Sequence, residues 1–165
     1  GTFAAADEDV VSYNPSTQRY TMVFDGSTNG LGAGGVDVDA VSVAGGNLYY
    51  SVNGTTRPTG VALPGGAAND IYRFDGTGVT GSSTRVVDAS QAPYSMPNSD
   101  VDGLKFIDAT HFYLSFRPDT TLPGLGAVQD EDVVLNNGGT WSNYFDGTAH
   151  GLTAAGADVD AFDIP

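Results

Sequence analysis

Short hydrophobic segments rich in valine, tyrosine and phenylalanine alternate with glycine- and asparagine-rich turns along the whole chain. Residues 38–43 and 48–52 have the composition of β-strands, and the Gly/Asn turn between them is typical of a hairpin. A second strand pair is predicted at 70–74 and 84–88, after a connection rich in proline and glycine. The sequence has no segment with the apolar periodicity of a three-turn helix. The pattern therefore predicts an all-β fold whose unit is a pair of hairpins.

The same plan recurs in the second half of the chain. Residues 101–107 and 112–116 form the next predicted hairpin, and residues 120–129 form a long connection. Strands at 133–135 and 141–145 complete a second four-stranded antiparallel unit. Two successive copies of one plan are typical of a repeat architecture.

A third unit is divided between the two ends of the chain. Its first strand is predicted at 159–164, its second begins at 2–4, and its outer pair is 10–13 with 20–24. We therefore expect both termini to meet and to close the last sheet. The predicted organisation is a single domain, residues 1–165, of three pseudo-symmetric repeats at about 37–99, 100–157, and 158–165 together with 1–36.

The order of hairpin, long connection and hairpin resembles a blade of a kelch-type β-propeller. This resemblance implies three four-stranded blades around a common axis, although the glycine pair and the paired tryptophan of kelch blades are missing. Propellers typically have at least four blades, so three blades must close unusually tightly or join with a second chain. A β-trefoil or a β-prism, each with three repeats of four strands, is the alternative fold.

Composition and charge limit the partners. Three repeats of about 60 residues are too short to bury separate cores, so they must share one. The net charge of −14 argues against nucleic acid and against an anionic membrane surface. No apolar run approaches the roughly 20 residues of a membrane span, so we expect no membrane insertion. Without cysteine, the chain has neither disulfides nor thiolate metal sites.

Most of the negative charge occupies repeated motifs. Asp-Val-Asp segments occur at 37–39, 100–102 and 158–160, each at the start of a predicted strand. The other two motifs are the acidic turns, at 7–9, 69–70 and 130–132, and the Phe-Asp-Gly turns, at 24–26, 87–89 (here Val-Asp-Ala) and 145–147. Together the three motifs hold 16 of the 20 acidic residues. Charge added for solubility would be scattered, so these carboxylates have a specific role.

Paired aspartates in this arrangement point to a cation. Residues two apart in a strand share a face, so each Asp-Val-Asp segment places two carboxylates together. Such like charges repel by several kcal/mol at about 4 Å, and a bound cation relieves the repulsion. The chain has 18 Asp and 2 Glu, and Ca²⁺ takes roughly six to eight oxygen ligands, many of them aspartates. The candidate Ca²⁺ ligands are Asp37, Asp39, Asp100, Asp102, Asp158, Asp160, Asp7, Asp9, Asp70, Asp130 and Asp132.

A carboxylate in a turn or before a strand can instead cap backbone amides. For Asp25, Asp88 and Asp146, in the Phe-Asp-Gly turns, capping is the interpretation that we expect. For the acidic turns, capping and cation binding are both left open.

Catalysis is not expected from this pattern. A catalytic carboxylate pair needs two different environments, whereas the three copies here are alike. The sequence contains no Ser-His-Asp order and no glycine-rich phosphate loop between a strand and a helix. A glycoside hydrolase-like enzyme is therefore the weakest alternative. A carbohydrate-binding domain is a stronger one, with sugar-stacking candidates Tyr49, Tyr50, Tyr72, Tyr94, Tyr113, Tyr144 and Trp141.

Five motifs resemble the acidic tandem repeats of predicted secreted or surface-anchored bacterial proteins. They are Asp-Val-Asp-Ala at 158–161, Phe-Tyr-Leu-Ser-Phe at 112–116, Leu-Pro-Gly-Leu-Gly at 122–126, Asp-Glu-Asp-Val at 130–133 and Tyr-Phe-Asp-Gly-Thr at 144–148. The resemblance implies an extracellular or cell-surface setting. With the aspartate pattern, it predicts a non-enzymatic, calcium-binding structural module for adhesion or assembly. Its expected partners are a metal cation and a glycan or another protein, including a second copy in a homodimer.

Overall fold

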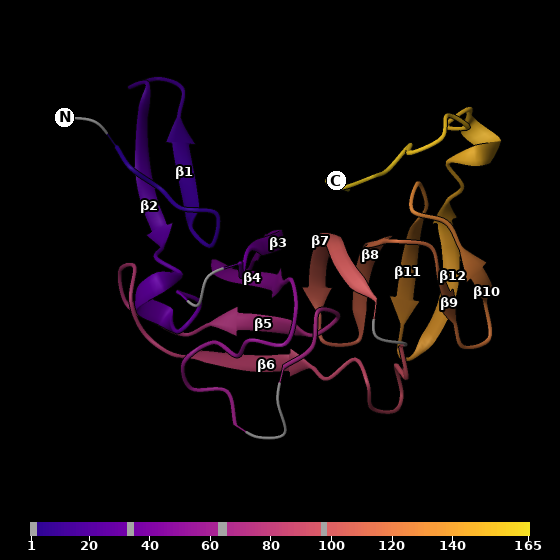
Figure 1. The fold of residues 1–165 in the computed structure, drawn as a ribbon, viewed down its shortest axis with the longest axis horizontal. Coiled ribbons are helices and arrows are strands. Elements are labelled where there is room, and N and C mark those ends of the chain that lie inside the picture. The colour runs from indigo at the N-terminus through magenta and orange to yellow at the C-terminus, as the bar shows by residue number, and fades with distance from the viewer. Residues whose placement is uncertain (1–2, 33–34, 63–65, 97–98) are drawn as a thin grey trace.

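Antiparallel β-strands make up nearly all of the regular structure, which confirms the predicted all-β class. The computed structural model describes residues 3–32, 35–62, 66–96 and 99–165. Its first four-stranded sheet has the strand order β3-β4-β5-β6, and its second has the order β7-β8-β11-β12 (Figure 1). The strands of the first sheet are β3 (Val38–Ala44), β4 (Asn47–Val52), β5 (Ile71–Phe74) and β6 (Ser83–Val87). Those of the second are β7 (Asp100–Asp108), β8 (His111–Arg117), β11 (Val133–Asn137) and β12 (Thr140–Phe145).

Local turn chemistry explains the hairpins. Between β3 and β4 the two-residue turn is Gly45-Gly46, with φ values of 55° and 80°. Between β11 and β12 it is Gly138-Gly139, with φ values of 60° and 90°. Positive φ at both central residues defines the type I′ turn, whose twist matches that of paired strands and which glycine adopts without strain. These hairpins were therefore predictable from the sequence.

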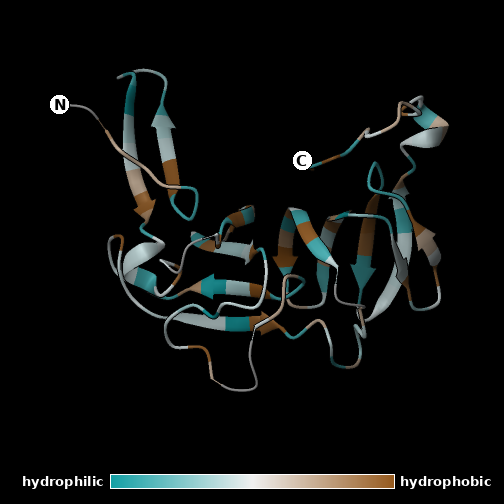
Figure 2. Cartoon of the chain, viewed as in Figure 1, coloured by the Kyte–Doolittle hydropathy of each residue, from teal (hydrophilic) through white to brown (hydrophobic). Residues whose placement is uncertain are grey.

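Two hydrophobic layers flank the first sheet. One layer lies between the two four-stranded sheets and includes the fully buried Phe112, Leu114 and Phe116 of β8. The other lies between the first sheet and the N-terminal hairpin, where Phe24 packs on Tyr50. Figure 2 shows hydrophobic segments on β7 and β11 and at the ends of β1 and β2 that approach the first sheet. The described residues thus form two hydrophobic clusters, with the first sheet contributing to both, where one core shared by all three units was expected.

Buried serine hydroxyls connect the two sheets. Ser51 on β4 accepts a hydrogen bond from the Ala40 N–H at 3.1 Å and donates one to the Val101 carbonyl on β7 at 2.7 Å. Ser42 on β3 accepts one from the Phe106 N–H at 3.0 Å. In addition, the Tyr49 ring stacks on Phe106 with the ring centroids 3.9 Å apart. These contacts fix β3 and β4 against β7.

The third unit does not form one sheet. Its outer strands, β1 (Val10–Asn14) and β2 (Arg19–Phe24), form a separate two-stranded sheet. Residues 159–164, where a strand was predicted, have no regular secondary structure and make no strand pairing within the described chain. The predicted strand at 2–4 is also absent at Phe3 and Ala4, while residue 2 lies outside the described residues. The termini stand apart (Figure 1), so closure by a shared sheet is not seen, and the described strands form no closed barrel of the kind in a β-trefoil.

The long connection of the second unit contains structure that the sequence analysis missed. Two three-residue strands, β9 (Thr120–Leu122) and β10 (Gly126–Val128), form a small hairpin. The helical elements of the described chain are single 3-10 turns, η1 (Ser27–Asn29) and η2 (Thr148–His150), each directly after a Phe-Asp-Gly turn. None of the helices in the described ranges is long and apolar enough to cross a membrane.

Candidate cation site

The three Asp-Val-Asp segments are held by the same backbone contact. In each, the N–H of the central valine donates to a backbone carbonyl of the preceding unit. That carbonyl lies in the acidic turn of the preceding unit or directly before it. The three bonds run from Val38 to Asp7 at 3.4 Å, from Val101 to Ala68 at 3.2 Å and from Val159 to Asp130 at 3.1 Å. The start of β3, the start of β7 and the C-terminal segment (residues 158–165) are thus anchored alike, although only the first two continue as strands.

An acidic pocket of about 400 Å³ lies where these segments meet. Its walls carry carboxylates from all three Asp-Val-Asp segments, one amide and one guanidinium group. The polar lining residues are Asp37, Asp39, Asn53, Asp100, Asp102, Arg117 and Asp160. The remaining aspartate of the motif, Asp158, has its Oδ2 4.0 Å from the Arg117 Nε. The fold therefore gathers the Asp-Val-Asp carboxylates in one place, from positions far apart in the sequence.

The carboxyl groups of Asp39 and Asp100 lie near each other, and each affects the ionisation of the other. Burial raises the pKa of Asp39 to about 7, and the charge of Asp100 and the shared hydrogen bond add to that effect. Burial also raises the pKa of Asp100, although Arg117 acts in the opposite direction. Two carboxylates in such a position resist simultaneous ionisation unless a positive group lies between them.

Asp102 is the most buried aspartate of the pocket, with 8% of its surface exposed. Its Oδ1 accepts a hydrogen bond from the Ser115 hydroxyl at 2.8 Å. Its Oδ2 is buried and has no hydrogen-bond partner among the described residues. Burial raises the pKa of Asp102 to about 6, the Ser115 bond lowers it, and the charges of Asp158 and Asp100 raise it further.

Unpartnered carboxylate oxygens are concentrated at this pocket. Within the part of the chain that the structure describes, four buried oxygens without a hydrogen-bond partner are Asp39 Oδ2, Asp100 Oδ1, Asp102 Oδ2 and Asp158 Oδ1. Burying a charge without a partner costs several kcal/mol, so such groups are normally neutralised. Arg117, the one cationic residue lining the pocket, has a side chain that is 74% exposed. A solvent-screened arginine offsets little of that charge, and either protons or a bound cation must neutralise the rest.

The pocket is not a closed metal cage. No group of three or more His, Cys, Asp or Glu side chains among the described residues has the spacing to hold a metal ion. Asp37 is turned toward Asn53, whose Nδ2 donates to Asp37 Oδ2 at 2.8 Å. The short side chains of Asp39, Asp100 and Asp102 would have to rotate toward one point to enclose an ion. Ca²⁺ accepts such variable oxygen arrangements more readily than Mg²⁺ does.

The metal-free protein is expected to lose stability as the pH rises from about 4 to about 6. Asp102 has a folded pKa of about 6 against an ordinary value of 3.8, so the folded state binds its proton more tightly than the unfolded state does. Its stabilising contribution is present below about pH 4, is lost above about pH 6, and is on the order of 3 kcal/mol. Urea unfolding in chelator, compared at each pH with Asp102→Asn, isolates this group. A wild-type advantage that grew with pH would contradict the expectation.

The acidic turns serve the backbone. The last aspartate of each turn accepts two backbone N–H groups, one from three residues earlier and one from a Phe-Asp-Gly turn. The bonds to Oδ2 run from Ala6 to Asp9 at 2.8 Å, from Ala67 to Asp70 at 3.1 Å and from Gln129 to Asp132 at 3.0 Å. The bonds to Oδ1 run from Gly26 to Asp9 at 2.9 Å, from Ala89 to Asp70 at 3.0 Å and from Gly147 to Asp132 at 3.0 Å. Of the two interpretations left open, these contacts favour capping for Asp9, Asp70 and Asp132, which do not line the acidic pocket.

The first residues of the outer acidic turns also lie outside the pocket. Asp7 is exposed and contributes its carbonyl to the Val38 anchor. Asp130 contributes its carbonyl to the Val159 anchor, and its own N–H donates to Asp119 Oδ1 at 3.1 Å. Neither side chain lines the acidic pocket, although the Asp130 carboxylate interacts with the charge of Asp158.

Capping is confirmed for two Phe-Asp-Gly turns. Asp25 Oδ1 accepts the Thr28 N–H at 3.1 Å, and Asp146 Oδ1 accepts the Ala149 N–H at 2.8 Å. Asp88, in the Val-Asp-Ala form of this turn in the first unit, instead pairs with the Arg85 Nη2 at 2.8 Å.

Three of the seven aromatic residues considered for sugar stacking are buried in the core, although Tyr144 is 53% exposed. Tyr50 and Tyr72 have no exposed surface, and Trp141 is 5% exposed. Tyr49 is covered by Phe106. Side chains in these positions are unavailable to stack on a carbohydrate.

Three polar residues of the site were missed from the sequence. Asn53 follows β4 and binds Asp37, Ser115 binds Asp102, and Arg117 lines the pocket. Ser115 could have been found, because Ser51 occupies the same position in the first unit's Tyr-x-Ser pattern. No protein-family model matches the chain, and no curated protein matches it.

Proposed function

We propose that the chain is a non-enzymatic extracellular module in which the acidic pocket binds Ca²⁺ and thereby holds neighbouring β-sheets together for adhesion or assembly. The main support is the set of buried, unpartnered oxygens of Asp39, Asp100, Asp102 and Asp158. They come from three separate segments, so one cation would neutralise charges that the exposed Arg117 offsets only in part.

Ligand chemistry favours calcium over other metals. The pocket offers carboxylate and amide oxygens, which hard cations prefer, and neither histidine lines it. His111 pairs with Asp108 at the end of a hairpin, and His150 stacks on Phe145. Asp39, Asp100 and Asp102 would supply the central ligands.

A cation here would act as a cross-link. Asp39 belongs to β3, Asp100 and Asp102 belong to β7, and Asp158 and Asp160 belong to the C-terminal segment. An ion shared among these ligands would connect both four-stranded sheets to the end of the chain. Removing the ion would leave repelling carboxylates at that junction, so we expect calcium to stabilise the fold.

A propeller-like arrangement of the units is part of the proposal. β3 and β7 are corresponding first strands, and they pack against each other through Ser42 and Phe106. The C-terminal segment packs against β7 in turn. Phe162 lies so close to Gly103 that a Cβ atom at position 103 would be 2.7 Å from the Phe162 ring. These contacts support a common axis for the three Asp-Val-Asp segments.

Calcium should raise the melting temperature by roughly 5 to 11 °C. A ligand at 100 times its dissociation constant adds about 2.7 kcal/mol, and each kcal/mol is worth about 2–4 °C for a chain of this size. Thermal unfolding by circular dichroism should be compared in calcium, in magnesium and in chelator at matched ionic strength, and magnesium should give a smaller shift. An identical melting temperature in calcium and in chelator would rule out the proposed site.

A further inference from the structure

The N-terminal hairpin has one strand edge without a partner in the described chain. β1 follows its acidic turn as β5 and β11 follow theirs, and each of the three pairs with the next strand along the sequence. β5 is also paired on its other side with β4, and β11 with β8. Among the described residues β1 pairs with β2 alone. Its second edge thus offers backbone groups that corresponding strands use for sheet pairing.

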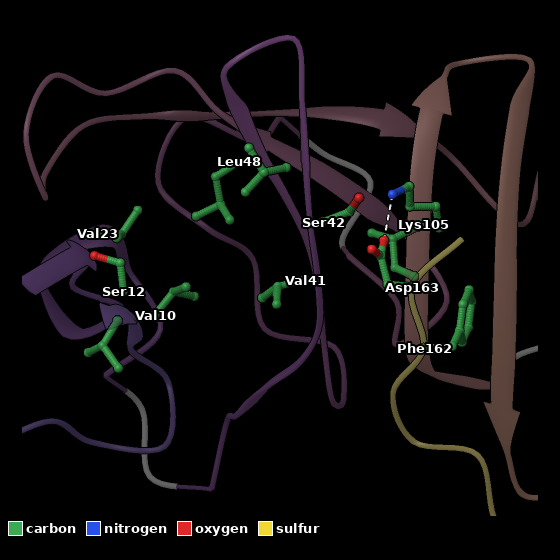
Figure 3. A pocket seen from close by; sticks show the side chains of 12 residues that line it. Val10, Ser12, Val23, Val41, Ser42, Leu48, Lys105, Phe162 and Asp163 are labelled. Carbon is green, nitrogen blue, oxygen red and sulfur yellow. Dashed lines mark hydrogen bonds and ion pairs between the residues drawn. The ribbon is translucent and has the colours of Figure 1, made fainter. Parts of the chain in front are cut away.

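A pocket of about 520 Å³ lies beside β1. Val10, Val11 and Val23 line it from the N-terminal hairpin, and Val41 and Val43 line it from β3. Figure 3 shows the far wall, formed by Phe162 and by the Lys105–Asp163 ion pair, whose N–O distance is 2.5 Å. The pocket therefore lies between the N-terminal hairpin and the C-terminal segment.

Exposed valines on β3 indicate which kind of element would cover this pocket. Val41 and Val43 are 47% and 70% exposed, whereas the corresponding Leu104 and Phe106 of β7 are each 3% exposed. Phe106 is buried because Tyr49 on β4 of the preceding unit stacks on it. By this correspondence, β3 lacks the covering strand that β7 has.

We propose that the edge of β1 and this pocket together bind an extended β-strand of the same type as β4 and β8, supplied by another polypeptide. β4 and β8 share a pattern of hydrophobic, Tyr, hydrophobic, Ser and hydrophobic residues, at 48–52 and 112–116. The strand pairs antiparallel with β1, as β4 does with β5. Its tyrosine covers Val43 as Tyr49 covers Phe106.

The binding mode is strand addition to a sheet edge. Backbone hydrogen bonds supply affinity in such complexes, and alternate side chains entering a pocket supply specificity. The ligand serine is placed to reach the Val38 carbonyl, by correspondence with the bond from Ser51 to Val101. None of the aspartates of the acidic pocket lines this site, so the inference does not rest on cation binding.

A synthetic peptide with the sequence of residues 111–117, His-Phe-Tyr-Leu-Ser-Phe-Arg, provides the test. We expect saturable one-to-one binding by calorimetry and slower amide hydrogen exchange along β1 by NMR. Replacing the peptide tyrosine by alanine should weaken binding about fivefold to tenfold, since a lost ring contact is worth about 1 kcal/mol. A scrambled peptide should not bind.

Two matched variants locate the site on the protein. Val43→Lys should abolish peptide binding, and Ile107→Lys, at an exposed aliphatic position of β7 outside this pocket, should leave it unchanged. If a second copy supplies the strand, sedimentation should show a dimer that the peptide and Val43→Lys both disrupt. Failure of the unmodified protein to bind the peptide, or equal binding by Val43→Lys, would overturn the proposal.

Discussion

Replacing Asp39 and Asp102 together by asparagine is expected to raise the free energy of unfolding in chelator at pH 8 by roughly 3–5 kcal/mol. The two aspartates have folded pKa values of about 7 and about 6, so both are forced to ionise at pH 8 in surroundings that oppose ionisation. Asparagine has the same shape, keeps an acceptor for Ser115, and can donate to Asp100. Urea unfolding in chelator measures the gain.

The same variant should no longer be stabilised by calcium. A matched control removes the same number of charges from aspartates that cap turns, as Asp25→Asn with Asp146→Asn, where the amide oxygen preserves each cap. The control should keep the wild-type response to calcium and nearly the wild-type stability in chelator. If both double variants responded to calcium alike, the effect would be a general one of net charge and not of the acidic pocket.

Asp70→Ala is expected to lower the free energy of unfolding by about 3–5 kcal/mol, in calcium and in chelator alike. Asp70 is 1% exposed, accepts the N–H groups of Ala67 and Ala89 at 3.1 and 3.0 Å, and pairs with Arg85 at 3.1 Å. Alanine leaves two amides without that acceptor and removes the buried one of the two carboxylates that pair with Arg85, and such losses together cost several kcal/mol. Urea unfolding monitored by circular dichroism is the measurement.

Asp88→Ala is the control for that substitution. Asp88 also pairs with Arg85, at 2.8 Å, but its side chain is 29% exposed and water can replace much of the contact. We expect a loss of about 1 kcal/mol or less. Equal losses for the two variants would show that Arg85 pairing, and not the backbone contacts of Asp70, accounts for the effect.

Local signals account for the part of the fold that the sequence predicted. The hairpins around Gly45-Gly46 and Gly138-Gly139 depend on neighbouring residues, so their strands were placed within a residue or two. Residues 159–164 have the same β-type composition, but a strand also needs a partner, and pairing is decided by distant parts of the chain. The β9–β10 hairpin has three residues per strand, too few for a recognisable alternation.

The repeated motifs indicated which aspartates occupy equivalent positions, but they could not separate the roles of these residues. A carboxylate oxygen can accept a hydrogen bond from an amide N–H or can bind a cation. The composition of the acidic turns was therefore compatible with both capping and cation binding. The distinction depends on which loop comes near. Gly26 and Gly147 reach Asp9 and Asp132 from 17 and 15 residues away, whereas no described amide reaches Asp102 Oδ2.

The valine N–H contact that anchors each Asp-Val-Asp segment leaves the residue types at the junction free to vary. It joins one unit to the next by main-chain atoms, so it survives side-chain substitution on either side. Ala68 already stands where the other two copies have Asp7 and Asp130, and the backbone bond to it is kept.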